Sequence, residues 1–394
     1  MLSRLLARRM RYDALILLGL LAAIVALVRF PQEAIQAATD GLALSFNVII
    51  PSLFPFFVLS TLMVRLGLTQ YFGRALEPVM RPLFNVSGAC SSAFVLGFVG
   101  GYPVGAKTAV ALYESGQISR VEAERLLAFS NNSGPAFILG IVGVGIFASS
   151  RVGLMLYAAH AVASVLVGVL FRRWGGRQAG GGRRARGPIE ATRFSQAFVS
   201  SVTGSLQATL NICGFVIFFT VFIHLLFLTG AISTISGLLG TLFTGLGFDA
   251  EWASSLLIGL IELSSGVWSL RDVAGQMSSA IAMAAFMLGW AGLSVHCQVL
   301  SFIGGSGLSV RSYILGKFLH GGISAGLIFL LTRFIPMDTT VAATLAEGVY
   351  GIAGTDFPTS IRISTLSAMA LWLGVMAVCL ISTKRARQKR KNSV

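Results

Sequence analysis

Glu262 is the residue of this sequence whose type and surroundings most strongly suggest chemistry. It is the charged residue within the otherwise uncharged run Gly259-Leu-Ile-Glu-Leu-Ser-Ser-Gly266. A carboxyl group in such an apolar segment is costly, so a function is the first interpretation. Glu262 could carry a proton or accept a hydrogen bond from a substrate, with Ser264 and Ser265 as neighbouring binding groups. The structural alternative is a carboxylate whose hydrogen bonds are satisfied by a neighbouring helix.

A second polar group stands before a helix-breaking dipeptide in the first half of the chain. Asn131, Asn132 and Ser133 supply several hydrogen-bond donors and acceptors immediately before Gly134 and Pro135. These side chains could cap a half-helix, or they could coordinate a ligand or an ion. Both interpretations are open from the sequence.

Gly101, Tyr102 and Pro103 interrupt another apolar segment at its centre. A break of this kind frees backbone amides that can bind an anion, and Tyr102 could form an aromatic wall. Lys107 follows four residues after the proline. It either extends to the inner membrane interface, or it faces the cavity and pairs with an anion or with Glu262.

The remaining titratable groups suggest proton transfer more than catalysis. His296 and Gln298 lie in Leu293-Ser-Val-His-Cys-Gln298 and could join a proton relay. The other three histidines stand apart in apolar spans and are interpreted as locally hydrogen-bonded: His160, His224 and His320. No metal-ligand spacing, nucleophile elbow, P-loop or dinucleotide motif is present. We therefore predict a protein that is not an enzyme and has no metal and no cofactor.

Composition shows which solvent surrounds these residues. Hydrophobic residues make up 55% of the 394 residues and charged residues only 11%. Runs of the length needed to cross a bilayer are expected at 13–30, 42–68, 152–171, 206–228, 313–334 and 364–382. The first of them follows four arginines and is interpreted as a membrane anchor. The chain is predicted to be a polytopic membrane protein in the lipid bilayer.

The net charge of +15 is concentrated in three places. Basic clusters lie at the N-terminus, in the Gly/Arg-rich segment 172–195, and in the tail after 383. Beside membrane spans such clusters mark the cytoplasmic face, so both termini are predicted to be cytoplasmic, and no nucleic-acid partner is expected. The segments 229–251 and 336–361 contain acidic residues and no basic ones, and are expected on the other side.

Similar interruptions recur about 160 residues apart, which suggests two related halves. Breaks are predicted at Gly100–Pro103, Asn131–Pro135, Ser264–Gly266 and Gly289–Gly292. Non-helical backbone at membrane depth needs a wet cavity or a protein environment, and paired breaks mark transporter sites. We predict an all-α inverted-topology repeat with broken helices and with re-entrant hairpins at 88–113 and 252–270. The predicted divisions are an anchor with its amphipathic connection (1–40), a first repeat (41–171), a basic linker (172–195), a second repeat (196–335), an outer loop (336–363), and a last span with its tail (364–394).

Five motifs carry a resemblance to a known family. They are Asn47 through Phe57, Gly100-Gly-Tyr-Pro-Val-Gly-Ala-Lys107, Ser130-Asn-Asn-Ser-Gly-Pro135, Gly259-Leu-Ile-Glu262 and Gly292-Leu-Ser-Val-His-Cys-Gln298. They resemble the sporulation integral membrane protein family of endospore-forming bacteria, known as YlbJ or stage V sporulation protein VV, which carries the nucleoside-recognition Gate domain. The resemblance spans roughly residues 40–335.

The resemblance implies a fold similar to that of concentrative nucleoside transporters. It also implies transport of dipicolinic acid across the outer forespore membrane into the developing spore. The residues themselves leave the small-molecule substrate open. A dianionic aromatic acid would suit Lys107, Tyr102 and the paired asparagines. The alternative cargo is a nucleoside or another organic anion. A nucleoside would suit Glu262 together with the asparagines. Protons or sodium could drive transport, and a non-transporting factor in spore envelope assembly is a further alternative.

Overall fold

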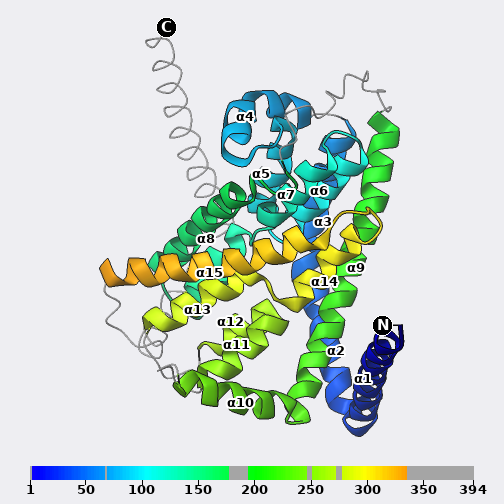
Figure 1. The fold of residues 1–394 in the computed structure, drawn as a ribbon, viewed down its shortest axis with the longest axis vertical. Helices are drawn as coiled ribbons and strands as arrows, with labels where there is room; N and C mark the ends of the chain where they lie inside the picture. Colours follow the sequence, from blue (N-terminus) through cyan, green and yellow to red (C-terminus); the bar gives the residue numbers. More distant parts are fainter. Residues whose placement is uncertain (1, 67–68, 177–193, 246–250, 272–276, 335–394) are drawn as a thin grey trace.

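The computed structural model describes residues 2–66, 69–176, 194–245, 251–271 and 277–334 (Figure 1). The predicted outer loop 336–363, the last span with its tail, and most of the linker 172–195 lie outside these ranges. The elements of the first half are α1 (Leu2–Arg29), α2 (Pro31–Leu44), η1 (Ser45–Ile49), α3 (Ile50–Arg65), α4 (Thr69–Phe84), η2 (Gly88–Cys90), α5 (Ser91–Gly100), α6 (Val104–Glu114), α7 (Arg120–Ser130), η3 (Ala136–Ile146) and α8 (Ser150–Phe171). Those of the second half are α9 (Phe194–Leu228), α10 (Ala231–Gly245), α11 (Glu251–Ile261), α12 (Leu263–Ser269), α13 (Met277–Trp290), α14 (Gly292–Ile303) and α15 (Val310–Phe334). The predicted all-α fold class is confirmed.

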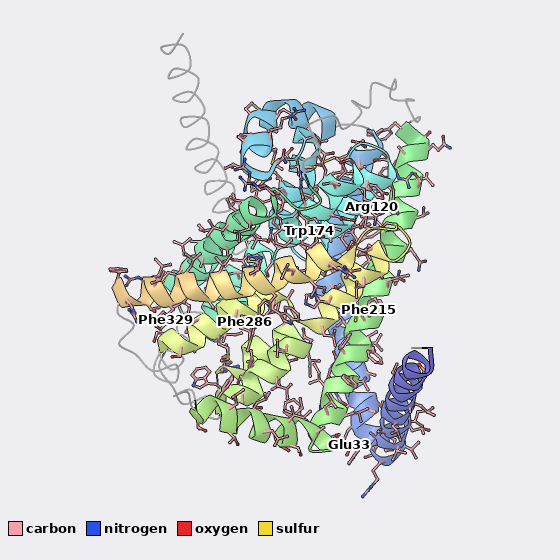
Figure 2. All side chains as sticks on the ribbon, viewed as in Figure 1. Glu33, Arg120, Trp174, Phe215, Phe286 and Phe329 are labelled. Atoms are coloured by element: carbon pink, nitrogen blue, oxygen red, sulfur yellow. The ribbon has the colours of Figure 1, made fainter. Side chains whose placement is uncertain are left out.

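Several of these helices can cross a membrane. By length and composition, the described residues hold four such helices, or up to six if each of two sharply bent helix pairs is counted as one span. Large apolar side chains are exposed, among them Phe218 on α9 and Phe329 on α15. Phe329 lies on the outside of the bundle in Figure 2. An apolar outer surface is what the hydrocarbon of a bilayer requires. The molecule is a polytopic helical membrane protein.

The N-terminal helices turn sharply at Phe30. The axes of α1 and α2 are bent by 99° there, and Pro31 begins α2, a position where its missing N–H costs nothing. From Pro31 the chain remains helical to Arg65, through the single π-helical turn η1. Helices α2 and α3 both pack along the long helix α9.

Two helix pairs fold back on themselves, one above and one below α15 in the view of Figure 1. In the first, α5 and α6 pack against each other, and the turn between them is Gly101 to Pro103. In the second, α11 and α12 pack against each other and meet at Glu262. The locations agree with the hairpins expected at 88–113 and 252–270.

Two further helices are broken in the middle. Residues 131–134 separate α7 from the π-helix η3, and Ala291 separates α13 from α14. Ala291 has a φ of +81°, which is unusual for a residue with a side chain. The unbroken helices α8 and α15 pack against each other between the two hairpins.

One predicted break lies at the wrong residues. Ser264–Gly266 was expected to interrupt a helix, but these residues are helical within α12. The interruption is at Glu262, whose extended backbone (φ −142°, ψ 123°) places its side chain at the start of α12. Gly266 is needed for packing instead, because a Cβ added there would lie 2.1 Å from the Cα atom of Gly259.

The two hairpins are closed by glycine contacts at matching positions. A Cβ added to Gly97 or to Gly105 would lie 1.9 Å from the carbonyl oxygen of Ser130. In the second half, Gly259 and Gly266 face each other, 162 and 161 positions after the first pair. Close backbone approach of this kind is what small residues permit at helix contacts in membranes. A close glycine pair therefore occurs within each hairpin.

Opposite membrane orientation of the two hairpins remains a prediction that labelling can test. Ser115, just after α6, and Thr244, at the end of α10, are both exposed. Cysteines introduced singly at these positions should react with a membrane-impermeant maleimide from opposite sides of a sealed vesicle. The unsubstituted protein is the control for its own cysteines. Labelling of both positions from the same side would contradict the inverted repeat.

Candidate functional site

In each half the hairpin turn touches the break of the broken helix. Gly101 has a φ of +74°, and a Cβ added to it would lie 2.9 Å from the backbone nitrogen of Gly134. Gly292 has a φ of +80°, and a Cβ there would lie 3.0 Å from the backbone nitrogen of Leu263. Only glycine combines this backbone conformation with so close an approach. In each half, a hairpin turn thus lies against the break of a helix. This is the arrangement expected of a binding site at helix breaks.

Asn131, Tyr313 and His296 form a buried hydrogen-bonded chain between the halves. Asn131 Nδ2 donates to the Tyr313 hydroxyl at 3.4 Å, and that hydroxyl lies 2.9 Å from His296 Nδ1. The roles of the hydroxyl and of His296 Nδ1 depend on the imidazole tautomer, which these contacts leave open. His296 Nε2 and Asn131 Oδ1 are buried and have no partner among the described residues. One ring nitrogen and one amide oxygen are thus left for a ligand.

Lys317 brings a positive charge into the same region. It is fully buried on α15, and its Nζ donates to the backbone carbonyl of Asn131 at 2.9 Å. The same ammonium lies 3.5 Å from His320 Nδ1 and 4.9 Å from the centre of the Tyr102 ring. The two ion pairs in the described ranges, Arg81–Glu77 and Arg120–Glu124, do not include it. A buried ammonium therefore stands here with neutral partners only.

His160 and His320 form a pair where α8 and α15 meet. Their ring centroids are 4.2 Å apart, and the two residues are separated by 160 positions, the spacing of the paired breaks. His320 Nε2 lies 2.9 Å from the carbonyl oxygen of His160, which can only accept, so Nε2 carries the proton. His160 Nε2 in turn accepts from the backbone nitrogen of Ser133 at 3.1 Å. The pair joins the break of the first half to both unbroken helices.

The other predicted residues of the first break are also buried. Asn132 is buried, and its Nδ2 donates to the carbonyl of Phe129 at 3.0 Å. Its Oδ1 is left without a hydrogen-bond partner in the part of the chain that the structure describes. Tyr102, at the hairpin turn, donates its hydroxyl hydrogen to the carbonyl of Leu288. The first hairpin therefore contacts the second half directly.

Lys107 does not lie in the first of the two settings expected for it, and its pairing with an anion stays a prediction. Its Nζ is buried and lies 4.0 Å from the centre of the Phe57 ring, so it does not extend to the interface. No hydrogen bond or ion pair to this Nζ occurs within the described residues. A cation over an aromatic face gains about 0.5–2 kcal/mol, which replaces only part of the lost hydration. An anionic partner would complete the coordination of this ammonium.

Glu262 acts on its own helix. Its two carboxylate oxygens accept from the backbone nitrogens of Ser264 at 2.9 Å and Ser265 at 2.7 Å, so it caps α12. The residues Ser264 and Ser265 are themselves exposed. Gln298 is buried on α14, two residues after His296. Among the residues that the structure describes, no hydrogen bond or ion pair links Glu262 to Asn131 or to Lys107.

The structure thus gathers some of the predicted residues and adds others. Tyr102, Asn131, Ser133 and His296 join one network. The interpretation of His160 and His320 as isolated histidines is wrong, because α8 and α15 bring the two rings together; His224 is exposed on α9. The residues that the sequence analysis missed are Lys317 and Tyr313. Lys317 could have been found from the rule used for Glu262, since it is an ionisable residue inside a predicted span.

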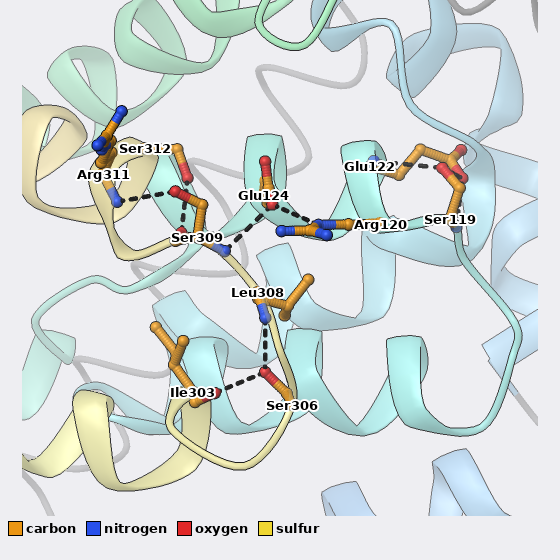
Figure 3. Close-up of polar contacts among 10 residues, drawn as sticks. All are labelled: Ser119, Arg120, Glu122, Glu124, Ile303, Ser306, Leu308, Ser309, Arg311 and Ser312. Atoms are coloured by element: carbon orange, nitrogen blue, oxygen red, sulfur yellow. Dashed lines mark hydrogen bonds and ion pairs between the residues drawn. The ribbon is translucent and has the colours of Figure 1, made fainter.

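A more peripheral contact also ties the halves together. Glu124 on α7 accepts from Arg120 at 2.9 Å and from the backbone nitrogen of Ser309 at 3.1 Å, in the connection between α14 and α15 (Figure 3). Glu122 and Ser119 form a capping box that fixes the start of α7. The orientation of α7, and so the position of Asn131 at its other end, is fixed at both ends.

Comparison with known proteins identifies the family to which this chain belongs. The family model described as "Gate: Nucleoside recognition" matches residues 46–171, within the first half. The chain is also 31% identical over 323 residues to the sporulation integral membrane protein YlbJ of Bacillus subtilis (strain 168), covering 78% of this chain and 79% of that protein. The chain belongs to this family of sporulation integral membrane proteins. A solved structure of a doubly substituted CNTnw in an outward-facing state is similar at 15% identity and a TM-score of 0.35, over 83% of this chain and 86% of that one.

Proposed function

We propose that this protein is a transporter that carries a small organic anion across a membrane of the sporulating cell. Dipicolinate is the cargo that the family resemblance implies, and the outer forespore membrane is the proposed location, with both chain ends in the cytoplasm. The family membership, the membrane-spanning helices and the paired breaks support a transport role. The partners are then the cargo, the bilayer and a possible driving ion.

The charge of the buried residues carries this proposal. Lys107 has a buried ammonium nitrogen with no hydrogen-bond partner and no carboxylate partner in the described ranges. Buried cations without a counter-charge are expensive in a medium of low dielectric constant. An anionic cargo supplies that counter-charge while it is bound. A neutral cargo leaves it missing.

A nucleoside is the second candidate cargo, because the matching family model is described by nucleoside recognition. The unpaired Oδ1 atoms of Asn131 and Asn132 could accept hydrogen bonds from a base edge or from ribose hydroxyls. This candidate gives no role to the unpartnered ammonium of Lys107.

Uptake into proteoliposomes tests the two cargoes against each other. The full chain is purified, reconstituted, and offered labelled dipicolinate or labelled uridine, with protein-free liposomes as the blank. Saturable dipicolinate uptake that unlabelled dipicolinate inhibits and uridine does not would support the anion carrier. Uridine uptake without dipicolinate uptake would overturn it.

The substitution Glu262→Gln distinguishes an anion carrier from a nucleoside carrier. Glutamine keeps one acceptor oxygen for the α12 amides, so the helix cap is weakened by about 1 kcal/mol and the protein still folds. For an anion carrier, dipicolinate uptake should stay within about threefold of the original rate, since an anion does not bind a carboxylate. Initial uptake rates, normalised to reconstituted protein, measure this. A loss of more than tenfold would instead place Glu262 in the cargo site.

A further inference from the structure

The ammonium of Lys317 lies at a special place in the fold. It bonds to the carbonyl of Asn131, the C-cap residue that follows α7, and it faces the ring of Tyr102 at the turn of the first hairpin. Carbonyl groups at the C-terminal end of a helix carry partial negative charge and have no partner within the helix. In transporters with broken helices, such carbonyls coordinate the coupling sodium ion or proton.

The hydrogen bonds of this ammonium are complete. An ammonium has three N–H donors and no acceptor. The carbonyl of Asn131 takes one of these hydrogens. His320 Nδ1 offers a lone pair to the second, because the proton of that imidazole is on Nε2. The Tyr102 ring faces the third, and Lys317 is 0% exposed, so no space is left there for a metal ion with its own oxygen ligands.

We propose that Lys317 is a covalently attached substitute for the coupling metal cation, and that transport by this protein therefore does not use sodium. This inference rests on the proposed transport function and identifies the group that supplies the positive charge at the site. The lysine holds the end of α7 and the hairpin turn together, as a bound cation would. Because the nitrogen of Lys317 is part of the chain, it cannot leave the site as a metal ion would, and an external sodium gradient has no binding site here on which to act.

Thermal stability of the purified full chain tests this without any cargo. The apparent melting temperature of the wild-type protein should be the same in sodium, potassium and choline chloride at equal ionic strength. Lys317→Ser removes the ammonium, leaves the carbonyl and adds a hydroxyl ligand. At sodium concentrations several times Kd, this variant should gain about 2–4 °C over the same variant in choline.

Two controls make the result specific. Lys317→Gln is neutral but still fills the space and donates to the Asn131 carbonyl, so it should show no sodium-dependent shift. Arg311→Gln removes a charge at the exposed start of the same helix and should behave as wild type in all three salts. Size-exclusion profiles establish that each variant is folded.

Two outcomes would overturn the proposal. One is a sodium-specific rise in the melting temperature, or sodium-driven uptake, in the wild-type protein. The other is a folded Lys317→Ser variant that responds equally to all three salts. If Lys317→Ser does not fold, the melting temperatures of the wild-type protein in the three salts decide whether the proposal holds. Failure of dipicolinate uptake in every salt would count against the proposed function and would leave the stability result standing.

Discussion

Replacing Lys107 by alanine is expected to lower the rate of dipicolinate uptake by about 10- to 150-fold while the protein stays folded and inserted. The ammonium is buried over the Phe57 ring and has no hydrogen-bond partner in the described chain. A charge-assisted hydrogen bond to a carboxylate contributes about 1.5–3 kcal/mol, which converts to that range of rates. Initial uptake rates into proteoliposomes, at equal amounts of reconstituted protein, provide the measurement.

The control for this variant is Arg311→Ala, which removes an exposed positive charge from the start of α15. It should transport at the original rate, because a screened surface charge contributes little. Normal dipicolinate uptake by Lys107→Ala would remove Lys107 from the cargo site. If uridine proved to be the cargo, Lys107→Ala should be mild and Glu262→Gln severe.

The Gly105→Ala substitution is expected to destabilise the protein by at least about 3 kcal/mol. The added Cβ would lie 1.9 Å from the carbonyl oxygen of Ser130 and 3.0 Å from the Cα atom of Gly97. Both obstacles are backbone atoms, so no side-chain rotation can relieve the overlap. The apparent melting temperature and the yield of monodisperse protein measure the effect.

Gly204→Ala is the matched control, because nothing lies within 4 Å of a Cβ at that position on α9. Alanine favours a helix over glycine by about 1 kcal/mol, so this variant should be equal to or slightly more stable than wild type. Equal stability of the two variants would show that α5 and α6 do not approach Ser130 as closely as the structure has it.

The helix breaks were predictable from the sequence because they depend on local residue types. Glycine and proline at 101–103 and at 134–135 interrupt helices wherever they occur together, so the breaks there could be placed within a residue or two. Glu262 was harder. Its carboxylate caps the start of α12, and the segment Ser264–Gly266 after it was mistaken for the break.

The polar network was less predictable because its contacts are distant in sequence. Lys317 and the carbonyl of Asn131 are 186 positions apart, and nothing local in either segment identifies the other. The spacing of His160 and His320 did carry a signal, since both residues occupy the same position in the two halves. The π-helical segments η1 and η3 were not predicted, although Pro51 stands two residues after η1 and Pro135 immediately precedes η3.

The glycine contacts around Ser130 also restrict how the molecule can move. Backbone atoms of α5 and α6 lie directly against the last carbonyl of α7, and no side chain stands between them that could change rotamer. A gate hinged at this contact would have to separate backbone from backbone and leave a polar group in a dry environment. The close contact therefore favours movement of the first hairpin together with its own broken helix over a hinge between them.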